Sequence, residues 1–253
     1  MKKILLSAKD LCKSFANNGG QNHVLDNVTL ELYEKDFTVI MGASGSGKST
    51  LLYCLSGMDS ATSGEVRYRQ EVISHYPEKK MAALRAKEFG FVFQQSHLVS
   101  NLTLYENVVV PGFLDKQKSG EAVQKKALEL LEQMHIREAK DRLPSQVSGG
   151  EAQRAAIARA VIADPGILFA DEPTGALNRR NTEDVLNLLT ELNRQGQSIL
   201  MVTHDVHAAV RASRLLYLDD GKIGGEMLMP EFTPEETRNR ETQINAWLSS
   251  MEW

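Results

Sequence analysis

One glycine-rich segment, GASGSGKST at residues 42–50, limits the possible folds of this chain more than any other feature. The apolar run Phe37–Met41 comes directly before it and is typical of a buried central strand, and the stretch TLLYCLSGM that follows has helical character. Glycines let the backbone wrap closely around an anion, and the N-terminus of the next helix points its positive dipole end at the same place. The segment therefore predicts a phosphate-binding loop between a strand and a helix.

Each residue type in this loop has a physical task. The pattern G-x-x-x-x-G-K-[ST] places Lys48 where an ammonium reaches the outer phosphates, and Ser49 where a hydroxyl completes the coordination of Mg²⁺. A glycine-rich turn that matches by chance is the alternative, and the strand before it and helix after it argue against that. The residues expected to bind the nucleotide are Gly42, Ser44, Gly45, Ser46, Gly47, Lys48, Ser49 and Thr50.

A second apolar run, Ile167–Glu172 (ILFADE), ends in two carboxylates. Ligands of open α/β sheets bind at the carboxyl ends of the strands, so we expect Asp171 in the metal shell. Glu172 is then expected at the γ-phosphate, where it orients or deprotonates the attacking water. Taken alone, such a pair is commonly a solvated strand end. Its place after a phosphate loop favours the functional interpretation.

The order of the remaining elements indicates the α/β class. Val28, Leu30 and Leu32 alternate with polar residues in a β-rich N-terminal third, as in a half-buried strand. A helical stripe follows at Val123, Ala127, Leu130, Leu131 and Met134. After Pro144 we expect a helix from Glu151, a strand over Ile167–Ala170, a helix over Thr182–Arg194, a strand over Ser198–Thr203 and a tight turn at Asp220–Gly221. This alternation predicts a mostly parallel sheet, an N-terminal antiparallel β part and a helical subdomain inserted at about residues 90–160.

Charge and composition exclude several classes of protein. The formal net charge of −4 argues against wrapping nucleic acid, so we expect no nucleic-acid partner. No stretch approaches the roughly 18–20 apolar residues that span a bilayer, and the start MKKILLSAKD lacks the apolar run of a signal peptide. Two cysteines make no disulfide framework. We expect a cytosolic protein that another chain would have to hold at any membrane.

A third motif, in the segment VSGGEAQRAAIARAVI, places Ser148, Gly149 and Gly150 immediately before a strong helix. This is a second anion-binding helix start, and Glu151 also suits the positive end of the helix dipole. In isolation, an ordinary helix cap would be the better interpretation of this segment. The order of the motifs decides the matter, because a phosphate loop, then SGGExQR, then ILFADE resembles the ABC-type ATPases.

The resemblance covers about residues 1–228 and implies a P-loop NTPase core with a helical signature subdomain. It implies that Gln94, in FVFQQ, touches Mg²⁺ and links to a membrane partner, and that His204, in VTHD, contacts the γ-phosphate. Phe15 stands where the family stacks an aromatic ring on adenine, with packing at a strand end as the alternative. The implied cofactors are ATP and Mg²⁺, with Lys48, Glu172 and His204 as catalytic residues and Ser49, Gln94 and Asp171 as metal ligands.

The resemblance also implies partners. In this family two cassettes pair head to tail, so each ATP would lie between the phosphate loop of one chain and the Ser148–Gly150 signature of a second copy. DEPTGALN and the segment Leu84–Val108 are similar to the ATPases of lipoprotein-release, macrolide-export and bacitracin-resistance systems, which work with an integral-membrane permease from the cytoplasmic face. Asn178 stands where this group normally has Asp, and Val147 where it has Leu.

Alternatives remain for the physiological role and for the tail. A non-transport ABC ATPase in DNA repair or on chromosomes or ribosomes, a soluble kinase, and an ATPase that serves sensing or cell-wall regulation rather than export are the rivals. We expect an ATPase domain over residues 1–230 and an amphipathic helix over 231–253, capped by Thr233 and Pro234. Its apolar face, Ile244, Trp247, Leu248 and Met251, either docks on its own domain or contacts a partner.

Overall fold

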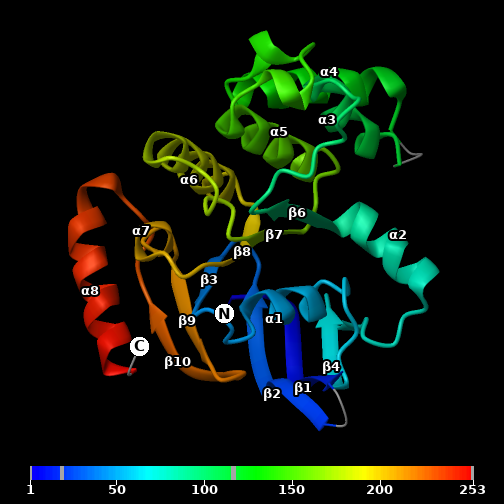
Figure 1. Cartoon of the computed structure of the whole chain (residues 1–253). Coiled ribbons are helices and arrows are strands. Elements are labelled where there is room, and N and C mark those ends of the chain that lie inside the picture. The colour runs from blue at the N-terminus through cyan, green and yellow to red at the C-terminus, as the bar shows by residue number, and fades with distance from the viewer. Residues whose placement is uncertain (1, 18–19, 115–117, 252–253) are drawn as a thin grey trace. The chain divides into compact units, whose positions relative to one another are not determined.

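The computed structural model describes residues 2–17, 20–114 and 118–251 (Figure 1). The chain forms two compact units. The first comprises Met1–Met81 and Asn193–Trp253, and the second comprises Ala82–Leu192. We describe each unit by itself, with α2 (Glu78–Glu88) carrying the chain from the first into the second.

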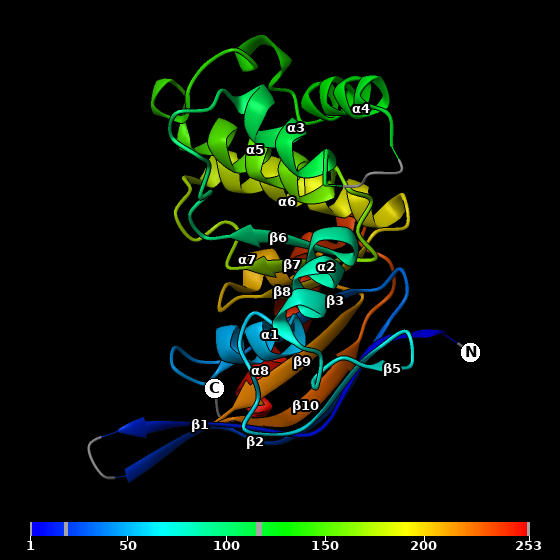
Figure 2. The same cartoon turned by 90° about the vertical axis from the view of Figure 1, so that its right-hand side faces the viewer.

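The first unit contains an antiparallel sheet with the strand order β2-β1-β4-β5. Its two long strands run side by side in both views (Figures 1 and 2), and Leu6 pairs with Leu32 and Ala8 with Leu30. Val28, Leu30 and Leu32 are buried, as their alternation with polar residues predicts. The strands are β1 (Ile4–Asn17), β2 (Gly20–Tyr33), β4 (Ser63–Tyr68) and β5 (Glu71–Val72).

The same unit contains a mostly parallel set of strands. β3 (Phe37–Met41) lies between β8 (Ser198–Val202) and β9 (Arg214–Asp219), pairs in parallel with both, and has all five residues buried. β9 turns back through Asp220–Gly221 into the antiparallel β10 (Lys222–Leu228). The predicted strand over Ser198–Thr203 is therefore confirmed except for its last residue, and the predicted mixed α/β fold is confirmed.

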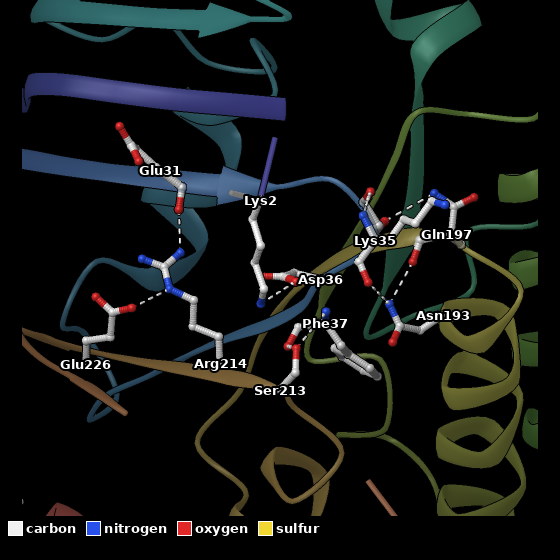
Figure 3. Close-up of polar contacts among 11 residues, drawn as sticks. Lys2, Glu31, Lys35, Asp36, Phe37, Asn193, Gln197, Ser213, Arg214 and Glu226 are labelled. Carbon is white, nitrogen blue, oxygen red and sulfur yellow. Dashed lines mark hydrogen bonds and ion pairs between the residues drawn. The ribbon is translucent and has the colours of Figure 1, made fainter. Parts of the chain in front are cut away.

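Arg214 connects the two sheets of the first unit (Figure 3). Its guanidinium donates to the backbone carbonyl of Glu31 on β2 and, at 2.7 Å, to the carboxylate of Glu226 on β10. The Tyr33 ring centroid lies 5.2 Å from the guanidinium carbon. Only 5% of Arg214 is exposed, and these carbonyl, carboxylate and ring contacts offset the cost of burying its charge.

The second unit combines a parallel pair of strands with helices. β6 (Phe89–Phe93) pairs with β7 (Ile167–Asp171), and Phe91 stacks on Phe169 with ring centroids 5.5 Å apart. The predicted helical stripe from Val123 to Met134 is buried. The helices are α3 (Leu104–Gly112), α4 (Gly120–Gln133), α5 (Gly149–Val161) and α6 (Arg179–Arg194), with single 3₁₀ turns at Arg137–Ala139 and Pro144–Gln146.

Sequence periodicity placed the starts of α5 and α6 too late. We predicted a helix from Glu151 and another over Thr182–Arg194, whereas α5 begins at Gly149 and α6 at Arg179. The residues missed at both helix starts are polar or glycine, so they do not contribute to the apolar repeat from which the helices were predicted. They are helical by their backbone hydrogen bonds rather than by burial.

The C-terminal helix α8 (Thr237–Ser250) packs on the first unit (Figure 1). Ile244 and Leu248 are completely buried, and Trp247 meets Tyr217 of β9 edge to face, with centroids 6.4 Å apart. Thr233 and Pro234 are the cap position and the first residue of a 3₁₀ turn, Pro234–Glu236, that leads directly into α8, although the Thr233 side chain accepts no capping hydrogen bond. The expected apolar face is thus occupied by the chain's own β-strands.

Arg240 adds a polar anchor to this interface. It is 2% exposed and donates hydrogen bonds to the carbonyl oxygens of Ala212 and, at 2.9 Å, Pro230. Glu241 on the next position contacts His207 of the short helix α7 (Val206–Ala209) at 3.0 Å. Within the described residues, no helix is both long enough and apolar enough to cross a membrane.

We predict that Leu248→Ala lowers the free energy of unfolding by about 2–5 kcal/mol, because it removes a fully buried side chain and leaves a cavity under α8. Urea denaturation measures the change. Gln243→Ala, at an exposed position of the same helix, is the control and is expected to stay within about 0.5 kcal/mol of the wild type. Equal effects of the two substitutions would contradict the docked position of α8.

Candidate functional site

The predicted phosphate loop lies between β3 and α1 (Lys48–Leu55) of the first unit. Gly42 lies against β9, because a Cβ built on it would come within 2.2 Å of the carbonyl oxygen of Leu218. Gly47 has a φ of 101°, in the left-handed region, and a Cβ on it would lie 2.8 Å from the carbonyl oxygen of Val24. Larger residues at either position would displace the backbone, so the local geometry requires both glycines.

The Lys48 side chain turns back into this loop. Its ammonium donates hydrogen bonds of 2.8 Å to the carbonyl oxygens of Gly42 and Ala43, and 6% of the residue is exposed. The side chain of Lys48 is therefore fixed inside the loop, where the sequence predicts an anion. The buried hydroxyl of Ser46 has no hydrogen-bond partner among the described residues, and it is a second polar group that a ligand would satisfy.

The turn between β9 and β10 supports the loop. The backbone N–H of Gly221 donates to the carbonyl of Ser46 at 3.2 Å, and the Gly221 carbonyl accepts from the N–H of Asp26 on β2 at 3.0 Å. The sequence predicted the turn at Asp220–Gly221 but gave no sign of this contact. The phosphate loop is therefore hydrogen-bonded to a turn distant in the chain, which is itself hydrogen-bonded to β2.

Phe15, on β1 of the first unit, is 44% exposed. This exposure argues against the alternative that it only fills a packing position. The ammonium of Lys13 lies 4.7 Å from the ring centroid, and Asp59 holds that ammonium at 2.7 Å. An exposed aromatic ring next to a fixed cation is suited to stacking on a flat ligand.

His204 is an exposed residue immediately beyond the end of β8 in the same unit. The residues on either side of it are tied together, because the Thr203 hydroxyl accepts a hydrogen bond of 3.0 Å from the backbone N–H of Asp205. Asp205 in turn caps α7 through the N–H of His207 at 2.9 Å. The backbone at His204 is thus fixed while its imidazole faces solvent.

The predicted carboxylates lie at the end of β7 in the second unit. Asp171 is the last residue of the strand, is 9% exposed and pairs with Phe93 of β6. Glu172 follows with a φ of 44°, a left-handed conformation that costs free energy in a residue with a side chain. The carbonyl of Glu172 accepts from the N–H of Gly175 at 3.0 Å, which closes a tight turn.

Gln94 begins an irregular segment directly after β6. It is exposed, and a Cβ built on Gly175 would lie 2.9 Å from its Nε2 atom, so its side chain covers the turn that follows Glu172. Within the second unit the fold therefore brings Gln94, Asp171 and Glu172 to one edge of the β6–β7 pair.

Polar side chains of α5 and α3 hold the backbone on both sides of Gln94. Gln153 of α5 donates to the carbonyl of Phe93 at 2.7 Å, and Arg159 of α5 donates to the carbonyls of Ser96 and His97 at 2.8 and 2.7 Å. Asn107 of α3, 2% exposed, exchanges hydrogen bonds with both backbone groups of Val99. Sequence reasoning missed all three residues. Gln153 stood in the quoted SGGExQR motif, but a lone polar residue within a helix does not reveal its partners.

The signature residues begin α5. Ser148 caps the helix by accepting from the N–H of Glu151 at 3.3 Å, and the Glu151 carboxylate accepts from the N–H and the hydroxyl of Ser148 at 2.8 and 2.7 Å. Gly149 is exposed, and Gly150 is buried against the side chain of Asn181. The helix-cap interpretation and the anion-site interpretation are therefore compatible, because the cap leaves Ser148 and Gly149 at the surface.

A surface cleft of about 540 Å³ opens beside Ser148 in the second unit. Three arginines and one aspartate give its lining an excess of positive charge, and Arg154 lies 3.6 Å from Asp184. The Nε atom of Arg154 is buried without a hydrogen-bond partner among the described residues. The cleft is lined by Ser148, Arg154, Asn178, Arg179, Arg180, Asn181 and Asp184.

The predicted site residues are thus divided between the units. Phe15, the loop from Gly42 to Thr50 and His204 belong to the first, with Ser44 and Gly45 exposed on the loop. Gln94, Ser148–Gly150 and the Asp171–Glu172 pair belong to the second.

Comparison with known proteins gives one consistent family. Residues 25–175 match the protein family described as ABC transporter. Two solved dimeric structures of the cassette MJ0796, one in a post-hydrolysis state bound to ADP and Pi and one described as a bacterial ABC transporter cassette, are 36% and 37% identical to this chain. Each covers 90% of this chain and 100% of its own, with a TM-score of 0.83.

A more distant structure supports the fold alone. The cbiO1 protein from Clostridium perfringens, part of the ABC transporter complex cbiONQ, is 24% identical. It covers 97% of this chain and 94% of its own, with a TM-score of 0.80.

The capping box predicts a pH dependence. The hydrogen bonds that Ser148 donates, from its side chain and then its backbone, hold the pKa of Glu151 below its usual value of 4.5. A carboxylate with a lowered pKa stabilises the fold above its unfolded-state pKa, and this contribution disappears as the pH falls through the folded-state pKa. The stability difference between wild type and Glu151→Gln should therefore be present at neutral pH and shrink below about pH 4.5.

Urea denaturation over a pH series measures that difference. Glu129→Gln, an exposed glutamate on α4 outside any cap, serves as the control. A difference for Glu151→Gln that is the same at acidic and neutral pH would refute the contribution of the ionised cap.

Proposed function

Because this chain belongs to the ABC transporter family, as one of its ATP-binding cassettes, we propose that it hydrolyses Mg-ATP as a dimer and thereby drives a membrane permease. The observation that carries the proposal is the phosphate loop, which contains two glycines that cannot be enlarged and holds the Lys48 side chain through its own carbonyl oxygens. Such a pocket favours binding of a polyphosphate, because its positive charge attracts the phosphates and its glycines let the backbone approach them closely.

We assign ATP binding to the residues predicted from the sequence. The loop amides and Lys48 would bind the phosphates, and the exposed ring of Phe15 would stack on adenine. The Ser46 hydroxyl, which lacks a hydrogen-bond partner in the described chain, would gain one from a phosphate oxygen. The full set on the loop is Gly42, Ser44, Gly45, Ser46, Gly47, Lys48, Ser49 and Thr50.

The oxygen-bearing side chains expected at the metal fit Mg²⁺. Ser49 offers a hydroxyl, Asp171 a carboxylate and Gln94 an amide oxygen, which are ligands that a small hard cation prefers. Bound there, Mg²⁺ would neutralise charge that develops on the phosphates.

Hydrolysis is assigned to three side chains. Glu172 would orient or deprotonate the attacking water, and His204 and Lys48 would contact the γ-phosphate. The left-handed backbone at Glu172 supports this role, because strained residues persist where the surrounding structure holds them for function. The fixed backbone and exposed ring of His204 are compatible with a ligand contact.

A second copy of the chain would complete each site. The positively charged cleft beside Ser148 has the chemistry to receive the phosphates of a nucleotide bound to another molecule. The two MJ0796 structures, described as dimeric, support this arrangement. ATP would then help to hold the two copies together, because its phosphates neutralise two surfaces that otherwise repel each other.

A permease is the partner that we propose at the membrane, with the cassette on its cytoplasmic face. The second unit exposes an apolar surface, the α3 patch, which we define as Val99, Val110, Phe113 and Leu114, each 46–65% exposed. Three of these lie on or just after α3, and Asn107 of α3 holds Val99. Apolar side chains gathered at the surface mark interaction sites. The description of cbiO1 as part of a transporter complex supports a partner of this kind.

We predict that Glu172→Gln reduces ATP turnover by about 10²–10⁴-fold, because it removes the general base and keeps the shape of the side chain. ATP binding should be retained, and the dimer should become visible by size-exclusion chromatography with Mg-ATP. Glu191→Gln, an exposed glutamate on α6, is the control for turnover. Undiminished hydrolysis by Glu172→Gln would remove this residue from the proposed role.

We predict that Val110→Ser with Phe113→Ser weakens co-purification of the proposed permease partner by at least about tenfold, because both substitutions remove apolar area from the α3 patch. ATP turnover of the isolated chain should be unchanged. Leu228→Ser, at a residue of the first unit that is 68% exposed, is the matched control. A wild-type chain that captures no permease would contradict the transporter proposal itself.

A further inference from the structure

Gln153 is a buried polar residue on α5 that the assigned chemistry does not use. It is 1% exposed, and its amide nitrogen donates to the carbonyl of Phe93 at 2.7 Å and to the carbonyl of Pro173 at 2.8 Å. A glutamine amide has two hydrogens, so both donors are used. One side chain thus joins two backbone segments that are separated by most of the second unit's sequence.

These two carbonyls flank the proposed reacting residues. Phe93 pairs with Asp171 across the β6–β7 ladder, and each is the last residue of its strand. The Phe93 carbonyl belongs to the peptide that leads to Gln94, and Pro173 directly follows Glu172. The amide of Gln153 therefore links the ends of β6 and β7, next to Gln94 and Glu172.

The turn after Asp171 needs such a restraint. Glu172 adopts a φ of 44°, which an isolated chain would leave. Pro173 has no N–H, so its carbonyl is its one backbone hydrogen-bonding group, and Gln153 binds it. Within the turn, the N–H of Gly175 also bonds to the Glu172 carbonyl.

We propose that Gln153 is a positioning residue for ATP hydrolysis, which fixes Glu172 and Gln94 relative to each other through the carbonyls of Pro173 and Phe93. The inference rests on the proposed roles of Glu172 and Gln94. It adds that helix α5, which begins with the signature residues Ser148–Gly150, transmits its own position to the hydrolytic residues through this amide.

The test compares kcat and ATP affinity for Gln153→Met and Gln153→Glu. Met removes both donors and keeps the length of the side chain, and an ionised Glu removes them and keeps its shape. We expect kcat to fall about 10- to 100-fold, because displaced catalytic groups lose their alignment. The Kd for ATP should stay within about twofold, because the phosphate loop belongs to the first unit. Rates are divided by the number of ATP-binding sites, so loss of folded protein does not imitate the effect.

Thr190→Val is the matched control. The Thr190 hydroxyl is buried in the same unit and donates to the carbonyl of Leu186 at 2.8 Å, away from the β6–β7 ladder. If Gln153→Met does not fold, Gln153→Glu is judged by the same criteria. A kcat within twofold of wild type, an equal fall in kcat and ATP affinity, or an equal fall for Thr190→Val would overturn the inference.

The proposed function is tested separately by the wild type and Glu172→Gln. If the wild type hydrolyses ATP and Glu172→Gln does not, the function stands, and silent Gln153 variants then overturn the positioning role alone.

Discussion

The backbone at the end of β3 approaches its neighbours so closely that two of its residues have room for no side chain, and the first unit depends on this constraint. Gly42 lies against β9 and Gly47 against β2, while the turn at Gly221 bonds to the loop between them. The buried central strand fixes where the loop begins, and α1 fixes where it ends. Between these limits the loop holds the Lys48 ammonium through the carbonyl oxygens of Gly42 and Ala43.

The second unit depends on a different constraint. Backbone groups in its segments without regular structure need hydrogen-bond partners. Buried carbonyls must find donors, and helix α5 supplies them through Gln153 and Arg159, while α3 contributes Asn107. The irregular segment after β6 and the strained turn after β7 are thereby both held to α5. A fold that anchors its loops in this way can expose Gln94 and the signature residues and still keep their backbone in place.

Function in this cassette is therefore a matter of position and charge rather than of covalent chemistry. The family places the chain among the ATPases of ABC transporters. The cap at Ser148 and the cleft beside it give the second unit a surface suited to anions, whereas the first unit carries the phosphate loop. The C-terminal helix, by contrast, packs its apolar face on the first unit, whereas the residues of the α3 patch are exposed on the second.

The sequence by itself determined the fold class, the central strands and the identity of the loop residues, because these signals are local. A strand period, a helix stripe or a glycine-rich loop is contained within about ten residues of chain. The sequence also identified Glu172 and Ser148 as candidate site residues. It did not reveal the left-handed backbone of Glu172 or the carboxylate that caps Ser148. Only the tertiary structure decided what holds the site together. Gln153 and Phe93 are 60 positions apart, and Arg240 and Ala212 are 28 apart. In the sequence, a polar side chain that makes such a hydrogen bond cannot be told from a solvated one. Its partner is a backbone carbonyl, and every residue has one.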